Sequence, residues 1–540
     1  MLSVPIKYCK DHGVINTDTL SIFNKICPKR RTFDTKVMIA IGFLRWLFNY
    51  QRNEIKLFLE GRGIKISTGE ISNLSEEFLL RFYVIHKNHS PQMKKLFDKN
   101  GGYILHLDGS AEAGDEITFT AKEGITGLTI DSWIMPSEGR DYIKPFLENI
   151  KAIYGSPLTV VRDMREEIAV SVSEVFTGVA QQICHYHFVR NIGDIIFKHR
   201  YEELRRAILN TKILARILSL KKKLMEGISN REIIVIAEYY WVRLAIEYIL
   251  HPRERKSDYP FVLPYLEVMN RIVEILEMFR KIVMWNSWHN KKIGFVLKFN
   301  EYLKKMVDTT EVQMWYKKIQ CIWKWFEEIR KVLRVSRELS EKGQINSPTM
   351  ANEIDQELKK TILKIRDEGR KLGGEFIAIS EKIYENCENH MEELFVKVMN
   401  KKGEEIKIVR NNGIEELNHR WSRMHIRRRT GRSRTTKEME KYGALLAVFS
   451  NIENENFINK VLNDVLDFVR DMQNVAEEEI QEARKLIRTF PQCPLIRFDA
   501  KRPVILREFI KVIGDEIDDI SDRDVEKWLK NFKTEALLTP

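Results

Sequence analysis

The sequence has few of the features that mark secreted, disordered or membrane-spanning chains. Its 540 residues include only 6 cysteines, none of them in a Cys-x-x-Cys pair, which argues against a disulfide framework. With 44% hydrophobic residues and only 14 prolines and 26 glycines, it is not disordered throughout. No run approaches the ~20 apolar residues of a transmembrane helix, and the start MLSVPIKYCKDH has no apolar signal-peptide core. We therefore expect a cytoplasmic protein of roughly three or four structural units.

Positive charge is in excess, with 89 Lys and Arg against 77 Asp and Glu and a formal net charge of +12. Such an excess favours a polyanionic partner where it is clustered. The densest cluster lies between residues 420 and 434, where seven of fifteen positions are arginine. Because Arg makes bidentate contacts with phosphate, this Arg run favours nucleic acid; a solvated helical face or an inter-domain ion-pair network is the alternative. The Arg run consists of Arg420, Arg423, Arg427, Arg428, Arg429, Arg432 and Arg434.

Residues 1–98 have the pattern of a helical domain. The segment VMIAIGFLRWLFNY has apolar residues all around, as a buried helix does. RNEIKLFLEGRG follows as a short amphipathic helix that ends in glycine, and a longer helix opens on the N-capping residues Ser67 and Thr68. A short helix, a glycine-containing turn and a longer helix are the order of a DNA-binding helix-turn-helix, with a plain helical hairpin as the alternative.

Residues 99–197 have the pattern of a mixed α/β layer. YILHLDGS, EITFTAKEG and GLTIDSWIMPS are spaced like an antiparallel meander, and DYIKPFLENIKAIYG follows as a helix. LTVVRD then indicates a strand, EEIAVSVSEVF a helix, and GVAQQICHYHFVRNIGDIIF a strand that passes into a further helix. The order of three strands, helix, strand, helix and strand predicts helices packed on a sheet.

Residues 198–405 lose the strand pattern, and their apolar residues recur at spacings of three and four, which predicts a helical block. We expect most of its tryptophans in the core, because aromatic residues at helical spacing usually are. Residues 406–445 contain the Arg run, and residues 446–540 indicate a C-terminal helical region whose tail changes from basic to acidic. The tryptophans of the block are Trp241, Trp285, Trp288, Trp315, Trp323 and Trp325.

Two aspartates end predicted strands. Asp108 closes YILHLD and Asp163 closes LTVVRD. Carboxylates at strand ends project into the crevice at the edge of a sheet, where ligands bind in layered folds. A single strand-end aspartate is more often a turn residue or a helix N-cap, and Asp163 before MREEI fits that alternative as well.

A cysteine and a histidine follow the last predicted strand. QQICHYHFVRN places Cys184 and His187 three residues apart, where a strand becomes a helix. Thiolate and imidazole are zinc ligands, but two ligands do not hold a structural zinc, and no second pair has suitable spacing. On this evidence we favour a buried cysteine and a histidine that is hydrogen-bonded to backbone or to nucleic-acid phosphate.

Taken in order, these motifs resemble those of the Mutator-like transposases, a group that includes many prokaryotic insertion-sequence transposases. LHLDG, VVRD and CHYHFVRN are followed by a long helical segment and then by NNGIEELNHR, so the motifs cover residues 103–191 and 411–432. The resemblance implies a ribonuclease H-like α/β catalytic core interrupted by a helical insertion, with helical N-terminal and C-terminal regions. The family signature falls here on Asp108, Asp163, Cys184 with His187, and Glu415 between Asn412 and Asn418.

The chemistry that the resemblance implies is cleavage and joining of DNA with two Mg²⁺ or Mn²⁺ ions about 4 Å apart. Asp108 would bridge both ions, while Asp163 and Glu415 would each complete one; Glu416 beside Glu415 leaves the register dependent on the flanking asparagines. Water would be the first nucleophile and a freed DNA 3′-hydroxyl the second. Cys184 and His187 would lie beside the acids.

The implied partners are double-stranded DNA, as transposon ends and as target, and further copies of the chain in a dimer or larger assembly. The helical insertion could clamp DNA, contact a second subunit, or stack an aromatic such as Trp285, Trp288 or Trp323 on a flipped base.

Three other interpretations remain. A structure-selective ribonuclease H-like nuclease or resolvase would share the acids without needing a sequence-specific N-terminal domain. A non-catalytic or decayed DNA-binding protein would keep the basic segment while tolerating loss of the acids, yet all three acids are present. A helical scaffold would account for the helical block but not for the strands.

Overall fold

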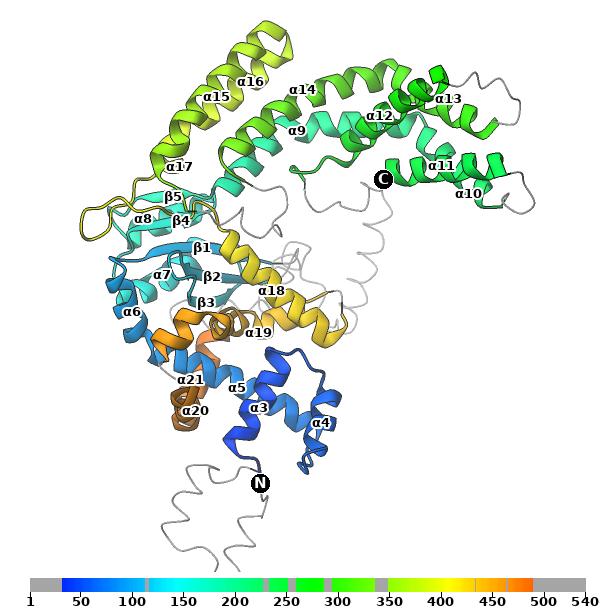
Figure 1. Cartoon of the computed structure of the whole chain (residues 1–540). Helices are drawn as coiled ribbons and strands as arrows, with labels where there is room; N and C mark the ends of the chain where they lie inside the picture. The colour runs from blue at the N-terminus through cyan, green and yellow to red at the C-terminus, as the bar shows by residue number, and fades with distance from the viewer. Residues whose placement is uncertain are drawn as a thin grey trace, which may run out of the picture. The chain divides into compact units, whose positions relative to one another are not determined.

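The computed structural model describes residues 32–111, 116–226, 233–250, 259–285, 294–335, 348–432, 434–462 and 465–488 (Figure 1). The chain divides into two compact units, Met1–Ala483 and Arg484–Pro540, and the fold below is that of the first unit. The acidic end of the predicted tail lies outside the described residues. None of the described helices is long and apolar enough to cross a membrane.

A five-stranded mixed sheet lies at the centre of the α/β region, as the sequence predicted. Its order is β3-β2-β1-β4-β5. The first three strands form an antiparallel meander, and β4 and β5 are parallel to β1. Residues of β1 are buried on both faces through Asp108, because helices cover both sides of the sheet. The strands are β1 (Ile104–Ser110), β2 (Ile117–Glu123), β3 (Thr129–Met135), β4 (Thr159–Arg162) and β5 (Gln181–Ile183).

Alternate residues of the strands identify which helices cover each face. Phe119 of β2 and Trp133 of β3 stack edge-on against Phe146 of α7 (Arg140–Tyr154), which packs beside α8 (Glu166–Val175). Thr118 and its partner Ile134 point the other way, toward Gly443 of α19 (Thr436–Phe449). Because successive side chains of a strand face opposite sides, α7 and α19 lie on opposite faces. Helix α18 (Gly413–Thr430) packs beside α19 and contacts β1 and β2 (Figure 1).

The described part of the N-terminal region is helical, as predicted. Asp34 caps the first of its helices by accepting from the Lys36 backbone, and the Ser67 hydroxyl accepts from the Glu70 backbone at the start of α5. The short helix α4, a turn through Gly63 and the longer α5 follow the expected order. The helices are α3 (Thr35–Trp46), α4 (Arg52–Glu60), α5 (Thr68–Asn88) and α6 (Ser90–Lys99).

Helix α5 joins the N-terminal region to the sheet. Its Tyr83 hydroxyl donates to Asp131 of β3 over 3.1 Å, and Lys87 forms an ion pair with the same carboxylate. Its Phe82 ring packs against Phe449 and Phe457. Phe449 ends α19 and Phe457 lies in the segment that follows it, so both α19 and this segment pack against α5. The segment continues as α20 (Val465–Asn474) and α21 (Glu477–Arg488).

The predicted helical block is present, and it is continuous with the sheet region through α9, which begins directly after β5 and runs past residue 198. Of its tryptophans, Trp325 is fully buried, and Trp241, Trp315 and Trp323 pack against the same apolar core. Trp288 and the side chain of Trp285 lie outside the described part of the chain. The helices are α9 (His185–Asn210), α10 (Ile213–Glu226), α11 (Ile233–Leu250), α12 (Pro264–Trp285), α13 (Gly294–Asp308), α14 (Thr310–Val332), α15 (Ala351–Leu372), α16 (Glu375–Asn389) and α17 (Met391–Leu394).

Candidate active site

The two predicted aspartates lie toward the C-terminal ends of neighbouring parallel strands. His106 of β1 is in register with Val161 of β4, and Asp108 and Asp163 each come two residues later. Asp108 lies within β1, whereas Asp163 directly follows the last residue of β4, and its Oδ1 accepts from the Arg165 backbone N–H at the start of α8. Asp108 is buried, with 6% of its surface exposed, whereas Asp163 is partly exposed at the end of β4. The sheet therefore places side by side two strands whose C-terminal ends carry aspartates 55 residues apart in the sequence.

Helix α18 covers Asp108. Its His419 places Nε2 3.8 Å from Asp108 Oδ2, and its Arg423 donates to the Ser110 hydroxyl at the end of β1. Burial, followed by the charges of Arg423 and Lys122, lowers the pKa of His419 to about 3. The imidazole is therefore neutral near pH 7 and does not cancel the negative charge of Asp108.

Glu415 and Glu416 occupy the turn of α18 that precedes His419, four and three residues before it. The helix backbone thus passes both positions over β1, but their side chains lie outside the described residues. Among the side chains that are described, no group of three His, Cys, Asp or Glu residues is arranged to hold a metal ion. The choice between Glu415 and Glu416 as the third acid stays a prediction.

A buried hydrogen-bond network fixes the start of α18. The Asn412 amide donates to the Leu107 carbonyl over 2.7 Å, and its oxygen is 3.2 Å from His106 Nδ1. Burial lowers the pKa of His106 to about 4, so this ring is neutral and donates its Nδ1 proton to Asn412. The Asn412 backbone also donates to the Cys184 sulfur over 3.2 Å. Asn412 therefore ties α18 to β1 and to the β5–α9 junction.

Cys184 and His187 have separate positions in this arrangement. Cys184 is fully buried, and its backbone donates to the Arg162 carbonyl, so it joins β5 to β4 and to the start of α18. His187 lies in the first turn of α9, where burial lowers its pKa and the charge of Asp163 opposes that shift. Its Nδ1 has no hydrogen-bond partner among the described residues. The motif thus supplies one buried residue that supports α18 and one imidazole near Asp163.

The Arg run divides into exposed and buried members. The exposed arginines can contact a polyanion directly, whereas Arg423 is half-buried against Ser110. Arg429 is 3% exposed and stacks on the Trp46 ring of α3, with its guanidinium carbon 3.9 Å from the ring centroid. Burial lowers the pKa of Arg429, and its nitrogens have no hydrogen-bond partner among the described residues. The exposed members are Arg420, Arg427, Arg428, Arg432 and Arg434.

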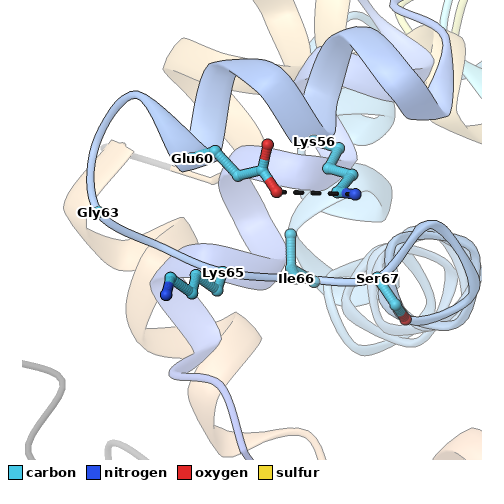
Figure 2. Close-up of a pocket in the computed structure, with 6 residues that line it drawn as sticks. All are labelled: Lys56, Glu60, Gly63, Lys65, Ile66 and Ser67. Atoms are coloured by element: carbon cyan, nitrogen blue, oxygen red, sulfur yellow. Dashed lines mark ion pairs between the residues drawn. The ribbon is translucent and has the colours of Figure 1, made fainter.

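A shallow cavity of about 590 Å³ lies elsewhere, between α4 and the start of α5 (Figure 2). Lys56 and Glu60 of α4 form an ion pair of 3.7 Å at its edge, and Lys65 lies on the turn that closes it. The cavity belongs to the helix-turn-helix candidate, since none of its lining residues comes from the sheet or α18.

Three residues near the aspartates were missed by the sequence reasoning. His106 precedes Asp108 by two positions and so shares its face of β1, a signal that the strand pattern could have given. His419 follows Glu415 by four positions on a helix, which is also a readable spacing. Glu138 comes from the turn before α7, and its place beside β1 has no sequence signal.

Comparisons with known proteins add no identification. No protein-family model matches the chain, and no curated protein was found to be similar to it.

Proposed function

We propose that this chain is a metal-dependent DNA transposase of the Mutator-like type, with the sheet as a ribonuclease H-like catalytic core. The observation that supports the proposal is that β1, which carries Asp108, is a parallel neighbour of β4, which Asp163 directly follows, and that α18, whose first turns carry Glu415, packs on β1. The long helical segment between the second aspartate and the glutamate also agrees with the resemblance.

The donor set suits hard divalent cations. Asp108 and Asp163 offer carboxylate oxygens, the ligands that Mg²⁺ and Mn²⁺ prefer, and Glu415 would complete the set from α18. Two bound ions would activate the attacking oxygen and neutralise the charge that develops on the phosphate. Because His419 is neutral, it leaves the charge of Asp108 available to a cation.

The residues around the acids would position the DNA and hold the acids in place. Asn412 fixes the start of α18 relative to β1, and so would determine the distance between the turn that contains Glu415 and Asp108. The exposed arginines of α18 follow on the same helix and would contact backbone phosphates next to the scissile strand. Helix α5 would recognise the transposon ends, and joining two ends would require a dimer or larger assembly.

The experiment that tests this proposal is strand cleavage of DNA that carries the gene's own flanking sequences, with Mg²⁺ or Mn²⁺ present. We expect the wild type to cut at the ends and to join the freed 3′-hydroxyl to target DNA. Glu415→Gln should be inactive, whereas Glu416→Gln, its matched neighbour, should retain activity.

Each other result points to a different function. Cutting of branched DNA without preference for the flanking ends would indicate a structure-selective nuclease. Binding of the ends without cutting, even with metal and paired ends, would indicate a non-catalytic DNA-binding protein. If Glu416→Gln is inactive and Glu415→Gln is active, the third acid is Glu416.

A further inference from the structure

Arg429 is a buried cation with no hydrogen-bond partner for its guanidinium among the described residues. It lies in the last turn of α18 and is 3% exposed, and all three of its side-chain nitrogens are buried. Burial and the charge of Arg45 lower the pKa of Arg429 to about 9, while Glu438 and Tyr442 oppose that shift. Because this pKa is still above 7, Arg429 keeps its positive charge at neutral pH.

An ion-pair network does not account for this buried charge. Glu438 is near enough to raise the pKa of Arg429, but in the described structure it accepts no hydrogen bond from the guanidinium. The stack on Trp46 and the negative end of the α18 dipole offset part of the cost of burial. An apolar side chain such as Met would fill the same space without that cost. The unpaired charge of Arg429 therefore indicates an anionic ligand.

Arg45 of α3 brings a second guanidinium to the same tryptophan. Its guanidinium carbon is 6.0 Å from the Trp46 ring centroid, compared with 3.9 Å for that of Arg429. Arg45 is half-buried, and its side chain donates to the Tyr50 carbonyl over 3.2 Å. Two guanidinium groups this close repel each other unless an anion neutralises them. A phosphate suits such a pair, because arginine forms charge-assisted hydrogen bonds with its oxygens.

The Trp46 ring is held in place, whereas the Arg429 guanidinium is not. Trp46 Nε1 donates to the Ser75 carbonyl of α5 over 2.7 Å, and the ring packs on that of Tyr442 with 5.0 Å between centroids. Among the described residues, the Arg429 guanidinium is held by its stacking contact alone, and the preceding Arg428 is exposed. Turning the guanidinium out to solvent would therefore cost one cation–π contact and restore its hydration.

We propose that Arg429 and Arg45 together bind one backbone phosphate of the DNA, and that the Arg429 guanidinium turns out from Trp46 when the DNA binds. This inference rests on the proposed function, because it takes DNA as the ligand. It makes α3 part of the DNA-binding surface, in addition to the exposed face of α18. One phosphate held by both arginines would connect the N-terminal region to the helix that contains Glu415.

The test is a fluorescence titration of the full chain with duplex DNA that carries the gene's flanking sequences, at several salt concentrations. We expect Arg429→Met to raise the Kd about 10-fold, the effect of losing one charge-assisted contact. The double variant Arg45→Met with Arg429→Met should reduce the slope of log K against log salt by about 0.9, the value for one phosphate. A reduction of about 1.8 would mean that each arginine contacts its own phosphate, and would overturn the shared site.

The matched control is Arg366→Met, which also removes an arginine that stacks on an aromatic ring. The Arg366 guanidinium carbon is 4.3 Å from the Tyr384 ring centroid, but this arginine already forms an ion pair with Glu381. Arg366→Met should therefore leave both the Kd and the salt slope unchanged.

The melting temperature of the DNA-free chain separates this role from a structural one. Arg429→Met should melt at or above the wild-type temperature, because it removes an unpaired buried charge, whereas a structural stack predicts a lower value. If the wild type binds and cuts DNA but Arg429→Met keeps the wild-type Kd, the phosphate site is overturned and the proposed function stands. Arg45→Met keeps the test decisive if Arg429→Met melts too early for titration, since an unchanged Kd there overturns the site as well.

The wild type itself distinguishes the two proposals. If it binds DNA with the expected dependence on both arginines but never cuts, the phosphate site stands and the proposed function is overturned. If the wild type does not bind DNA at all, both are overturned.

Discussion

The sheet region and the helical segment from α9 to α16 are stabilised by different kinds of contact. Around the sheet, buried polar side chains join distant parts of the chain: the Asn412 amide donates to the Leu107 carbonyl, and Arg410 donates to Gln182. The helical segment instead shares one apolar cluster that extends from Ile183 to Phe395. Among described residues 186–395, the buried polar side chains are Asn300, Glu327, Thr349 and Ser380.

In the sheet region, specific hydrogen bonds fix the relative positions of the elements. In the helical segment, apolar packing supplies the stability. Apolar packing tolerates many substitutions of similar volume, whereas a buried hydrogen bond specifies both partners and their orientation. The network of His106, Asn412 and Cys184 specifies where α18 crosses β1, which is the geometry that the proposed chemistry needs. Substitutions around the sheet should therefore affect DNA cleavage, whereas substitutions in the helical segment should affect stability.

The largest effect is expected at the aspartates. Asp108→Asn or Asp163→Asn should lower the rate of DNA cleavage at least ~10³-fold, because several kcal/mol of transition-state stabilisation depend on the ions. The measurement is the single-turnover cleavage rate at saturating Mn²⁺. Asp367→Asn, on the exposed face of α15, should cut at the wild-type rate. If all three variants lose cleavage activity equally, the loss reflects the change in net charge and not the position of the carboxylate.

The helical segment should respond through stability. Trp325 is fully buried, donates to Glu368 over 2.9 Å and stacks edge-on with Phe376. Trp325→Ala should cost about 3–5 kcal/mol, the usual range for such truncations. Hydrogen exchange should show the loss in α14 and α15 while Mn²⁺ still binds. Loss of Mn²⁺ binding at a temperature where the sheet remains protected would show that the two regions are coupled.

Asn412→Ala should lower the cleavage rate about 10–100-fold, because the start of α18 loses its bonds to Leu107 and His106. The melting temperature should change far less than in Trp325→Ala. The matched variant is Asn300→Ala, which removes a buried amide from α13 and should cut DNA normally. If the two variants behave alike, the Asn412 network has no special role in the site.

The exposed arginines should act on DNA affinity alone. Replacing Arg420 and Arg428 by Gln should weaken binding and reduce the slope of log K against log salt by about 2, since each phosphate contact contributes ~0.9. The measurement is a fluorescence titration at several salt concentrations. Lys371→Gln with Lys382→Gln, on exposed faces of α15 and α16, removes the same charge from the helical segment. An unchanged slope in the arginine variant would make that part of α18 structural.

Acid should destabilise the sheet region through its buried histidines. Burial lowers the pKa of His86 to about 4, and its Nε2 lies 2.9 Å from the Thr129 carbonyl. Between that value and the ordinary 6.5, the unfolded chain binds a proton that the folded chain does not, so stability falls as pH falls. Between pH 7 and pH 5.5, the free energy of unfolding of His86→Gln should therefore fall by about 1 kcal/mol less than that of the wild type. Urea unfolding at both pH values checks this, and equal losses would contradict it.

The sequence predicted the elements better than their contacts. The strand pattern predicted β1 and β4 around Asp108 and Asp163, and the structure shows these strands as parallel neighbours. No periodicity could place Glu138, because a turn residue approaches β1 only where Gly109 leaves room. Charge density suggested that Arg429 faces solvent, yet Trp46, 383 positions earlier, covers it. Such contacts depend on how distant segments pack, and one sequence does not contain that information in readable form.

The central claim is that β1, the end of β4 and α18 together form one metal site. The most direct test replaces Mg²⁺ by Fe²⁺ and adds ascorbate and peroxide, so that hydroxyl radicals cut the polypeptide next to the bound ion. The account predicts cuts near residues 108, 163 and 415 of the wild type, and their loss in Asp108→Asn. Cuts at other places, or cuts that persist in Asp108→Asn, would contradict it.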